Sequence, residues 1–322
     1  MEEKLKKNKE ISLKASLKSS DTEEWWDIHF NRPIGFFWAK VAIPLHITPN
    51  MITIASIFIG SAGSLMFYYN DLKLNIIGML LLILANTFDS ADGQLARLTG
   101  NKTRLGRILD GLAGDIWFFI IYLVLVLRLI NIDSMNPWLV WIVAVVAGAS
   151  HILAASMADY YRNVQLYFAK GEKGSEHDHS EKIDEDYKNT KFFEKPFTKI
   201  SLFFYRNYTK TQEILSPKLQ AFSKTFKGLY PNQAPKEICE EIRQKNLKYM
   251  PLTNILQFNT RVAFLFLSIF LNKVWLYFVF DIVVMNAILI YLIYSEEKLF
   301  ESYNNKFKQL SNIDKENNQA DC

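Results

Sequence analysis

Several stretches of about 20 mostly apolar residues constrain the fold of this chain more than any other feature. They lie at residues 50–70, 72–91, 108–130, 137–158, 252–271 and 273–294. A helix that crosses the hydrocarbon core of a bilayer needs roughly 20 such residues. Hydrophobic residues make up 50% of the 322 residues, and most charges fall between these stretches. We therefore expect an all-α, polytopic membrane protein with a six-transmembrane helix bundle.

The distribution of lysine and arginine predicts the orientation of the six spans. Basic residues crowd the segment before the first span, the loop between the second and third spans and the segment after the fourth, whereas the opposite loops carry few charges. Short loops rich in lysine and arginine stay in the cytoplasm. We therefore expect a multi-pass protein of the inner (plasma) membrane, with both termini and the active site cytoplasmic.

Composition divides the chain into five predicted parts. Residues 1–45 form a cytoplasmic arm, and aromatic residues at helical spacing predict an interfacial amphipathic helix at its end. Residues 46–163 hold the first four spans, and residues 164–250 form a polar cytoplasmic insertion with helical periodicity. The last two spans lie in residues 251–298, and residues 299–322 form a cytoplasmic tail.

Acidic residues gather where the second apolar stretch meets the third. A carboxylate at membrane depth costs about 2.5 to 3.5 kcal/mol on insertion scales, so it normally has a function. Asp89 and Asp92 lie one helical turn apart and can ligate one hard cation. Asp110 follows a short turn and can face that pair from the next helix. Because no His or Cys joins them, the oxygen ligands favour Mg²⁺, Mn²⁺ or Ca²⁺ over zinc.

Small and basic residues beside these acids extend the predicted site from metal to phosphate. Gly93 and Ala96 predict a notch in which a phosphorylated ligand can approach the backbone. Arg97 supplies a planar, permanently charged fork for a phosphate. A metal and an arginine around a diphosphate suit displacement at phosphorus, because the attacking and leaving oxygens both gain charge.

These residues resemble the signature of the CDP-alcohol phosphatidyltransferases, D-x-x-D-G-x-x-A-R, eight residues, G-x-x-x-D-x-x-x-D. The matching positions are Asp89, Asp92, Gly93, Ala96, Arg97, Gly106 and Asp110. The upstream segment ITPNMIT resembles the start of the family's first helix and adds Asn50 and Thr53 as candidates near the nucleotide. The resemblance covers residues 45–165 well and the last two spans loosely.

One acid departs from the signature. The last aspartate is expected at position 114, which is Gly114, and the acid follows at Asp115. In a regular helix, five residues rotate a side chain by about 140° from Asp110. A π-bulge near Gly111 or Gly114 would restore the alignment, and we expect one because such bulges accompany functional sites. Without a bulge, Asp115 points elsewhere.

The resemblance implies transfer of a phosphatidyl group from CDP-diacylglycerol to a small polar alcohol, such as inositol phosphate, with release of CMP. It implies Mg²⁺ or Mn²⁺ as cofactor, a homodimer, membrane lipids as partners and no nucleic acid. The implied metal ligands are Asp89, Asp92, Asp110 and Asp115. The implied nucleotide contacts are Asp89, Gly93, Ala96, Arg97, Asn50 and Thr53. Asp110 and Asp115 are the implied catalytic residues, with Asp115 activating the acceptor hydroxyl.

Polar residues outside the signature are candidates for binding the acceptor. The candidates are Arg104, Ser156, Arg162 and Arg261. A phosphate on the acceptor would require a cation, which Arg162 or Arg261 could supply. The end of the fourth span, rich in tyrosine and arginine, also suits an interfacial anchor. Asp281 and Asn286 are expected to hydrogen-bond between helices.

Three other functions remain open. The same motif serves transfer from a CDP-linked small alcohol to a lipid hydroxyl. Carboxylates in membrane helices also occur in transporters and proton relays, although clustering beside glycine and arginine at one edge argues against this function. The shifted acid also suits a family member that has lost catalysis and acts as a scaffold. Release of CMP would distinguish the enzyme from the transporter and the scaffold.

Overall fold

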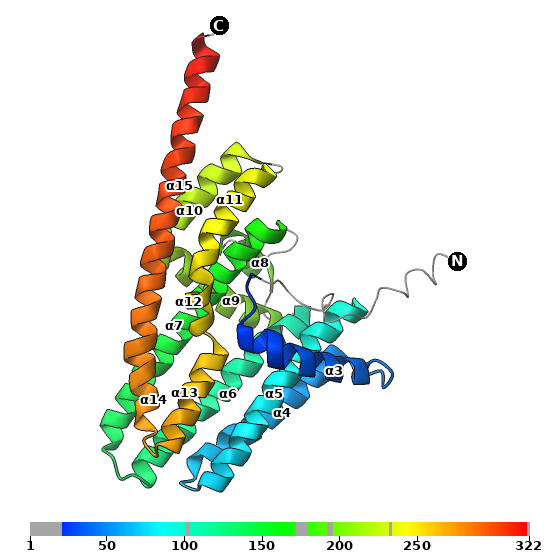
Figure 1. The fold of residues 1–322 in the computed structure, drawn as a ribbon, viewed down its shortest axis with the longest axis vertical. Coiled ribbons are helices and arrows are strands. Elements are labelled where there is room, and N and C mark those ends of the chain that lie inside the picture. The colour runs from blue at the N-terminus through cyan, green and yellow to red at the C-terminus, as the bar shows by residue number, and fades with distance from the viewer. Residues whose placement is uncertain (1–20, 101–103, 172–179, 192–195, 232–233, 321–322) are drawn as a thin grey trace. The chain divides into compact units, whose positions relative to one another are not determined.

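Every regular element in the described part of the chain is a helix, which confirms the predicted fold class. The computed structural model describes residues 21–100, 104–171, 180–191, 196–231 and 234–320 (Figure 1). Two compact units are formed, the first by residues 1–151 and 258–284 and the second by residues 152–257 and 285–322.

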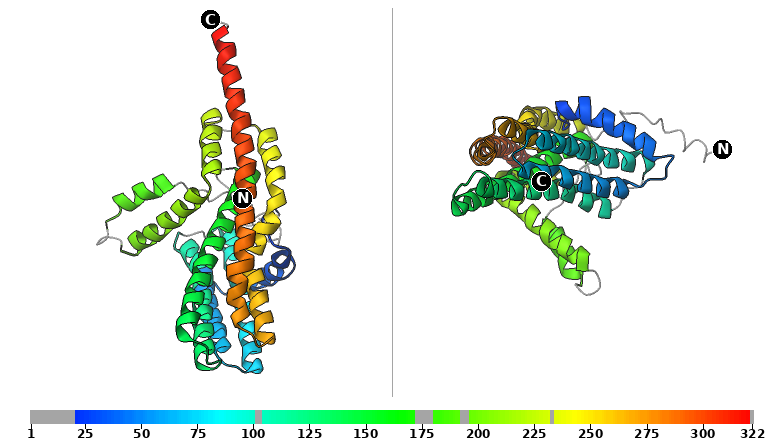
Figure 2. Two further views of the ribbon diagram at one scale, coloured as in Figure 1. Left: turned by 90° about the vertical axis from the view of Figure 1, so that its left-hand side faces the viewer. Right: turned by 90° about the horizontal axis from the view of Figure 1, so that it is seen from below.

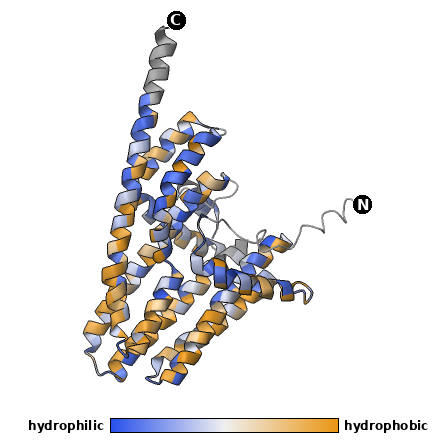
Figure 3. Cartoon of the chain, in the orientation of Figure 1, coloured by the Kyte–Doolittle hydropathy of each residue, from blue (hydrophilic) through white to orange (hydrophobic). Residues whose placement is uncertain are grey.

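Five helices within the described ranges are long and apolar enough to cross a membrane. They are Pro49–Tyr68, Leu72–Thr99, Gly111–Asn131, Pro137–Lys170 and Trp275–Gln309. Figure 3 shows that the last of these changes from apolar to hydrophilic along its length. The six-span count is not confirmed, because the stretch predicted at 252–271 is divided into α12 (Met250–Ile255) and α13 (Phe258–Phe270). At 1.5 Å per residue, α13 is roughly 20 Å long, shorter than the roughly 30 Å hydrocarbon core.

Sequence signals at the helix ends define the elements of the first unit. These elements are η1 (Asp27–Asn31), α3 (Arg32–Ala42), α4 (Pro49–Leu65), η2 (Met66–Tyr68), α5 (Leu72–Thr99), α6 (Arg104–Asn131), the first part of α7 (Pro137–Lys170), α13, α14 (Trp275–Val279) and most of η5 (Phe280–Met285). The Thr48 side chain caps α4, with Pro49 at the first helical position. Asp71 caps α5, which ends at Gly100 in the left-handed conformation.

Glycines let α4 approach both α5 and α6 closely. A Cβ atom on Gly63 would lie 2.8 Å from the carbonyl oxygen of Gly78, so the backbones of α4 and α5 are almost in contact there. A Cβ on Gly60 would lie 2.3 Å from the indole nitrogen of Trp117, which is buried on α6. These three helices therefore form a tightly packed scaffold.

Arg128, near the end of α6, holds two interhelical turns together. Its guanidinium donates hydrogen bonds to the carbonyl oxygens of Phe67 and Tyr69 and to the side chain of Asn75, at 2.9–3.2 Å. It also donates to the side chains of Asn70 and Asn272, at 2.8 and 3.2 Å. The α4–α5 and α13–α14 turns thus lie at one end of the unit, together with the α6–α7 turn (Figure 1).

The second unit is built around the polar continuation of α7. Its other helices are α8 (Ser180–Asn189), α9 (Pro196–Leu215), α10 (Pro217–Leu229), α11 (Lys236–Asn246), η4 (Leu247–Tyr249), α12 and α15 (Asn286–Ala320). Phe168, Phe222 and Phe300 pack together in its core. Figure 2 shows α8 and α9 projecting as a pair from α7 and α10.

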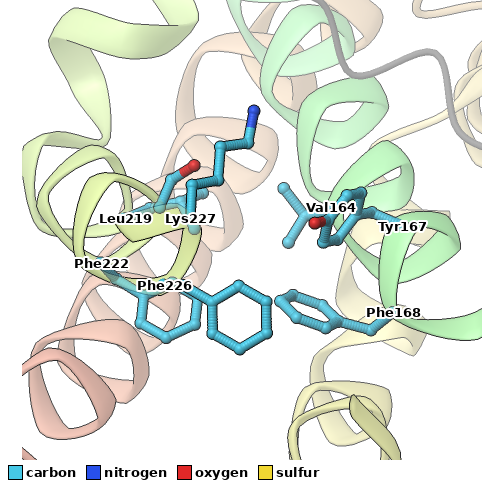
Figure 4. A pocket seen from close by; sticks show the side chains of 8 residues that line it. Val164, Tyr167, Phe168, Leu219, Phe222, Phe226 and Lys227 are labelled. Carbon is cyan, nitrogen blue, oxygen red and sulfur yellow. The ribbon is translucent and has the colours of Figure 1, made fainter. Parts of the chain in front are cut away.

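A small pocket lies between α7 and α10 in the second unit (Figure 4). Its lining residues are Val164, Tyr167, Phe168, Leu219, Phe222, Ser223, Phe226 and Lys227. No predicted site residue is among them, so this pocket is a feature of the aromatic core rather than of the candidate site.

Candidate active site

The predicted signature forms one stripe near the C-terminal end of α5. Asp89, Asp92, Gly93, Ala96 and Arg97 follow one another at intervals of three, one, three and one residues on a continuous α-helix. This spacing places them on a single helix face. Asp92 is buried, whereas the other four positions are partly exposed. The stripe therefore combines a fixed carboxylate with more accessible groups.

A side chain from α4 holds the buried carboxylate. The hydroxyl of Thr53, itself buried, donates a hydrogen bond to Oδ2 of Asp92. The same hydroxyl lies 3.1 Å from the carbonyl oxygen of Pro49 and can serve only one of these acceptors at a time. Thr53 is thus brought to the stripe. Asn50 lies one turn earlier on α4 and is partly exposed.

Arg97 occupies the notch that was predicted for a ligand. Its Nη1 and Nη2 atoms lie 3.4 and 3.6 Å from the point where a Cβ of residue 93 would stand. The guanidinium therefore folds back over Gly93, one turn earlier on α5. The missing side chain of Gly93 leaves room for this position of Arg97, close to the two aspartates.

The N-terminal arm packs on the other side of the same segment of α5. A Cβ on Gly35 would lie 3.0 Å from Oγ of Ser90, so α3 approaches α5 directly beside Asp89. Arg32 donates to Ser90 at 3.4 Å, and Gln94 donates to the carbonyl oxygen of Arg32 at 3.0 Å. These contacts were not predicted, because no spacing along the sequence relates residues 58 to 62 apart.

A network around Asn259 adds further polar groups on the α3 side. The side-chain nitrogen of Asn259 lies 2.8 Å from Oε2 of Glu24 and 3.0 Å from Oδ1 of Asp27. Its oxygen accepts a hydrogen bond of 3.4 Å from Asn86, one turn before Asp89. The arm and α13 therefore both reach the level of the stripe.

The π-bulge predicted near Gly111 or Gly114 is absent from the described helix, and that prediction was wrong. Residues 104–131 form one α-helix, α6. Among the described residues, no atom lies within 4 Å of a Cβ added to Gly111 or Gly114. Asp115 therefore lies about 140° around α6 from position 110. It is exposed, on the same side as the exposed Leu112 and Phe119.

The stripe provides the ligand type, although not the full set, expected for a hard cation. Asp89 and Asp92 offer carboxylate oxygens one turn apart, which suits Mg²⁺ or Mn²⁺. Among the side chains that the structure describes, no group of three or more His, Cys, Asp or Glu could hold a metal. The side chain of the predicted third ligand, Asp110, lies outside the described residues.

Arg261 takes part in a buried ion pair rather than in an open pocket. It donates to Asp281 of the π-helical η5, and both side chains are fully buried. Tyr122 of α6 also donates to Asp281, and its hydroxyl lies 3.4 Å from Nδ1 of His151. The prediction that Asp281 is a hydrogen-bonding partner between helices is confirmed.

The remaining acceptor candidates belong to other parts of the chain. Ser156 is buried in the second unit, and its carbonyl oxygen accepts a hydrogen bond from Gln212 at 2.8 Å. Arg162 is partly exposed two turns further along α7. Arg104 begins α6, but its side chain lies outside the described residues. Asn286, predicted to hydrogen-bond between helices, begins α15.

Two comparisons with known proteins bear on this site. Residues 46–173 match the sequence model of a family described as CDP-alcohol phosphatidyltransferase. A stretch of 65 residues is 40% identical to an uncharacterized protein of Aquifex aeolicus (strain VF5). That stretch is 20% of this chain and 32% of the relative, so it spans about a third of the relative's length. The resemblance found in the signature is thus confirmed for residues 46–173, and members of this family are phosphotransferases.

Proposed function

Because residues 46–173 form a CDP-alcohol phosphatidyltransferase domain, we propose that this enzyme transfers a phosphatidyl group from CDP-diacylglycerol to a small polar alcohol. CMP is the second product. One observation carries the proposal: Thr53 of α4 holds Asp92 within a stripe that also presents Asp89 and Arg97. The arginines that the sequence offers as acceptor contacts, such as Arg104 and Arg162, favour an acceptor with its own phosphate, such as an inositol phosphate.

The stripe suits the binding of a nucleoside diphosphate group. Asp89 and Asp92, with Asp110 of α6, would hold a divalent cation, which would neutralise the charge that develops on the diphosphate. Arg97 would donate hydrogen bonds to the same phosphates from its position over Gly93. Asn50 and Thr53 approach the stripe from α4, and Ala96 leaves room beside it for the nucleotide.

Asp115 is our candidate for the general base. The acceptor hydroxyl oxygen forms a bond to the phosphatidyl phosphorus, the bond from that phosphorus to the CMP oxygen breaks, and the hydroxyl proton passes to the Asp115 carboxylate. The acid of the signature supports this role, although α6 turns Asp115 about 140° away from position 110. Arg104, Ser156 and Arg162 are the candidate contacts for the acceptor.

We further propose that α13 is a sixth crossing, so that both termini lie in the cytoplasm. At its start, Asn259 contacts Asn86 of α5. Just after its end, Asn272 shares the guanidinium of Arg128 with Asn75, near the start of α5. Although α13 is short, it therefore runs beside most of the membrane-embedded length of α5. The basic segments that flank the spans favour the inner membrane with its cytoplasmic face at the stripe.

The exposed aromatic residues of the N-terminal helix support its placement in the membrane interface. The exposed aromatic residues are Trp25 and Trp26 just before η1, Phe30 of η1 and Phe37 of α3. Such residues lie at the boundary between headgroups and acyl chains. The opposite side of α3 packs on α5 beside Asp89. In this proposal one helix therefore contacts both the lipid and the candidate site.

A homodimer remains a prediction, to be checked by light scattering in detergent.

An assay of CMP release tests the proposed reaction. The purified protein in detergent receives CDP-diacylglycerol, Mg²⁺ or Mn²⁺, and separately glycerol 3-phosphate, inositol 1-phosphate, inositol or serine. We expect metal-dependent CMP release with a phosphorylated acceptor. Release only with a CDP-linked small alcohol and a lipid hydroxyl would replace our donor assignment. No release with either donor class would contradict catalysis and favour the scaffold.

A further inference from the structure

One face of α9 exposes large apolar side chains although α9 belongs to the hydrophilic insertion. Ile200, Phe203, Phe204 and Ile214 are between 43% and 66% exposed. They lie at helical spacing together with the exposed Asn207, Lys210 and Thr211, so they form one face. A water-facing helix rarely carries so much apolar surface on one side.

The other two sides of α9 are occupied, which fixes the orientation of this face. Towards α8, Arg206 pairs with Asp184 at 3.0 Å, and Glu213 accepts a hydrogen bond from the backbone of Ser180 at 3.0 Å. Towards α7, Gln212 donates to the carbonyl oxygen of Ser156. Neither contact covers Phe204 or Ile214.

The contacts with α7 place α9 where α7 leaves the bilayer. Besides the bond to Ser156, Tyr208 of α9 donates to Asp159 at 3.3 Å. Asp159 is the first charged residue along α7, which is one of the helices long and apolar enough to span a membrane. Ile152, one turn before Ser156, is 67% exposed. An apolar side chain exposed on a spanning helix faces lipid, so the C-terminal part of α9, which holds Tyr208 and Gln212, lies within about one turn of the lipid surface.

We propose that α9 is a second interfacial helix, whose face of Ile200, Phe203, Phe204 and Ile214 enters the boundary between headgroups and acyl chains of the same bilayer. The adjacent Lys210 can extend its ammonium group to the headgroups. This inference goes beyond the proposed reaction, because the matched domain ends at residue 173. In this proposal the insertion, which belongs to the second unit, binds the membrane directly through α9.

The test uses the full chain in lipid nanodiscs, with Cys239 and Cys322 replaced by serine. A fluorescent NBD label is attached to Phe204→Cys, to Ile214→Cys or, as a matched control, to Glu185→Cys on α8, which is also exposed. We expect the labels at 204 and 214 to emit at shorter wavelength. Lipids brominated on the acyl chains should quench these two labels at least twofold more than the control.

Three outcomes would overturn the proposal. Labels at 204 and 214 that are as exposed to water as the control would show that the face is solvated. Labels shielded from both bromine and water would indicate a protein partner, such as a second copy. Equal quenching at 204 and 185 would show that the whole hairpin is immersed rather than one face. Because none of the labelled positions is buried, loss of the fold is not expected, and a melting curve of each labelled protein checks this.

Discussion

Thr53 on α4 donates a hydrogen bond to Asp92 on α5, so the buried carboxylate of the stripe depends on a helix that lies outside the acidic motif. The close backbone contact between Gly63 and Gly78 holds these two helices together further along. The orientation of Asp92 is thus a property of the α4–α5 pair rather than of α5 alone.

Thr53→Val should impair catalysis while keeping the shape of the side chain. The change removes one hydrogen bond to a charged group, which contributes about 1.5–3 kcal/mol. We expect kcat/KM for CMP release to fall roughly 10- to 100-fold, and Thr53→Ser to restore most of it. Ser64→Ala, which removes a hydroxyl bonded within α4, is the matched control and should change little. Unchanged activity in Thr53→Val would show that the hydrogen bond from Thr53 to Asp92 does not contribute to catalysis.

Asp92→Asn should abolish turnover with Mg²⁺, and Asp110→Asn should do the same if it is the third ligand. Loss of a ligand carboxylate weakens the hold on a hard cation. Titration with Mn²⁺, followed by electron paramagnetic resonance, measures binding independently of activity. Full activity in either variant would contradict the assignment of that residue as a metal ligand of the site.

Asp115→Asn should lower kcat without weakening metal binding. A positioned general base contributes roughly 10²- to 10⁴-fold to rate, so we expect a loss of at least about 10²-fold. The Mn²⁺ titration should match the wild type, because α6 places Asp115 about 140° away from position 110. Weaker Mn²⁺ binding would instead make Asp115 a ligand, as the resemblance first implied.

Arg97→Lys should raise the KM for the CDP-linked donor. Lysine keeps the charge but loses the planar fork that can bind two phosphate oxygens at once. We expect a rise of roughly 10-fold, in line with the loss of one charged hydrogen bond. Gly93→Ala provides a companion, since its Cβ would stand 3.4 Å from the guanidinium and should shift it only slightly. An unchanged donor KM in Arg97→Lys would contradict phosphate binding by this residue.

Arg128→Met should destabilise the first unit without touching the site. The change leaves the buried polar groups of two turns without their donor, at a cost of about 1–3 kcal/mol for each unsatisfied group. We expect the melting temperature in detergent to fall by about 5 °C or more. Lys73→Met, an exposed cation in the first turn of α5, should leave it unchanged. Equal melting temperatures for the two variants would show that the hydrogen bonds of Arg128 contribute little.

The sequence by itself determined five long apolar helices, the motif and the family that residues 46–173 match. Runs of about 20 apolar residues predicted the long helices, because a bilayer leaves the backbone few other ways to satisfy its hydrogen bonds. The spacing of Asp89, Asp92, Gly93, Ala96 and Arg97 placed them on one face, because helix geometry is local.

Only the tertiary structure decided which groups surround that face. The contacts of Thr53 with Asp92 and of Gly35 with Ser90 join residues 39 and 55 positions apart, and no periodicity along one helix predicts such pairs. Among the described residues, π-helical segments lie at Asp27–Asn31 and Phe280–Met285 rather than at Gly111 or Gly114. Arg261 is held there by Asp281 and is buried with it. Burial and pairing depend on which helices pack together, and in this protein close glycine contacts permit that packing.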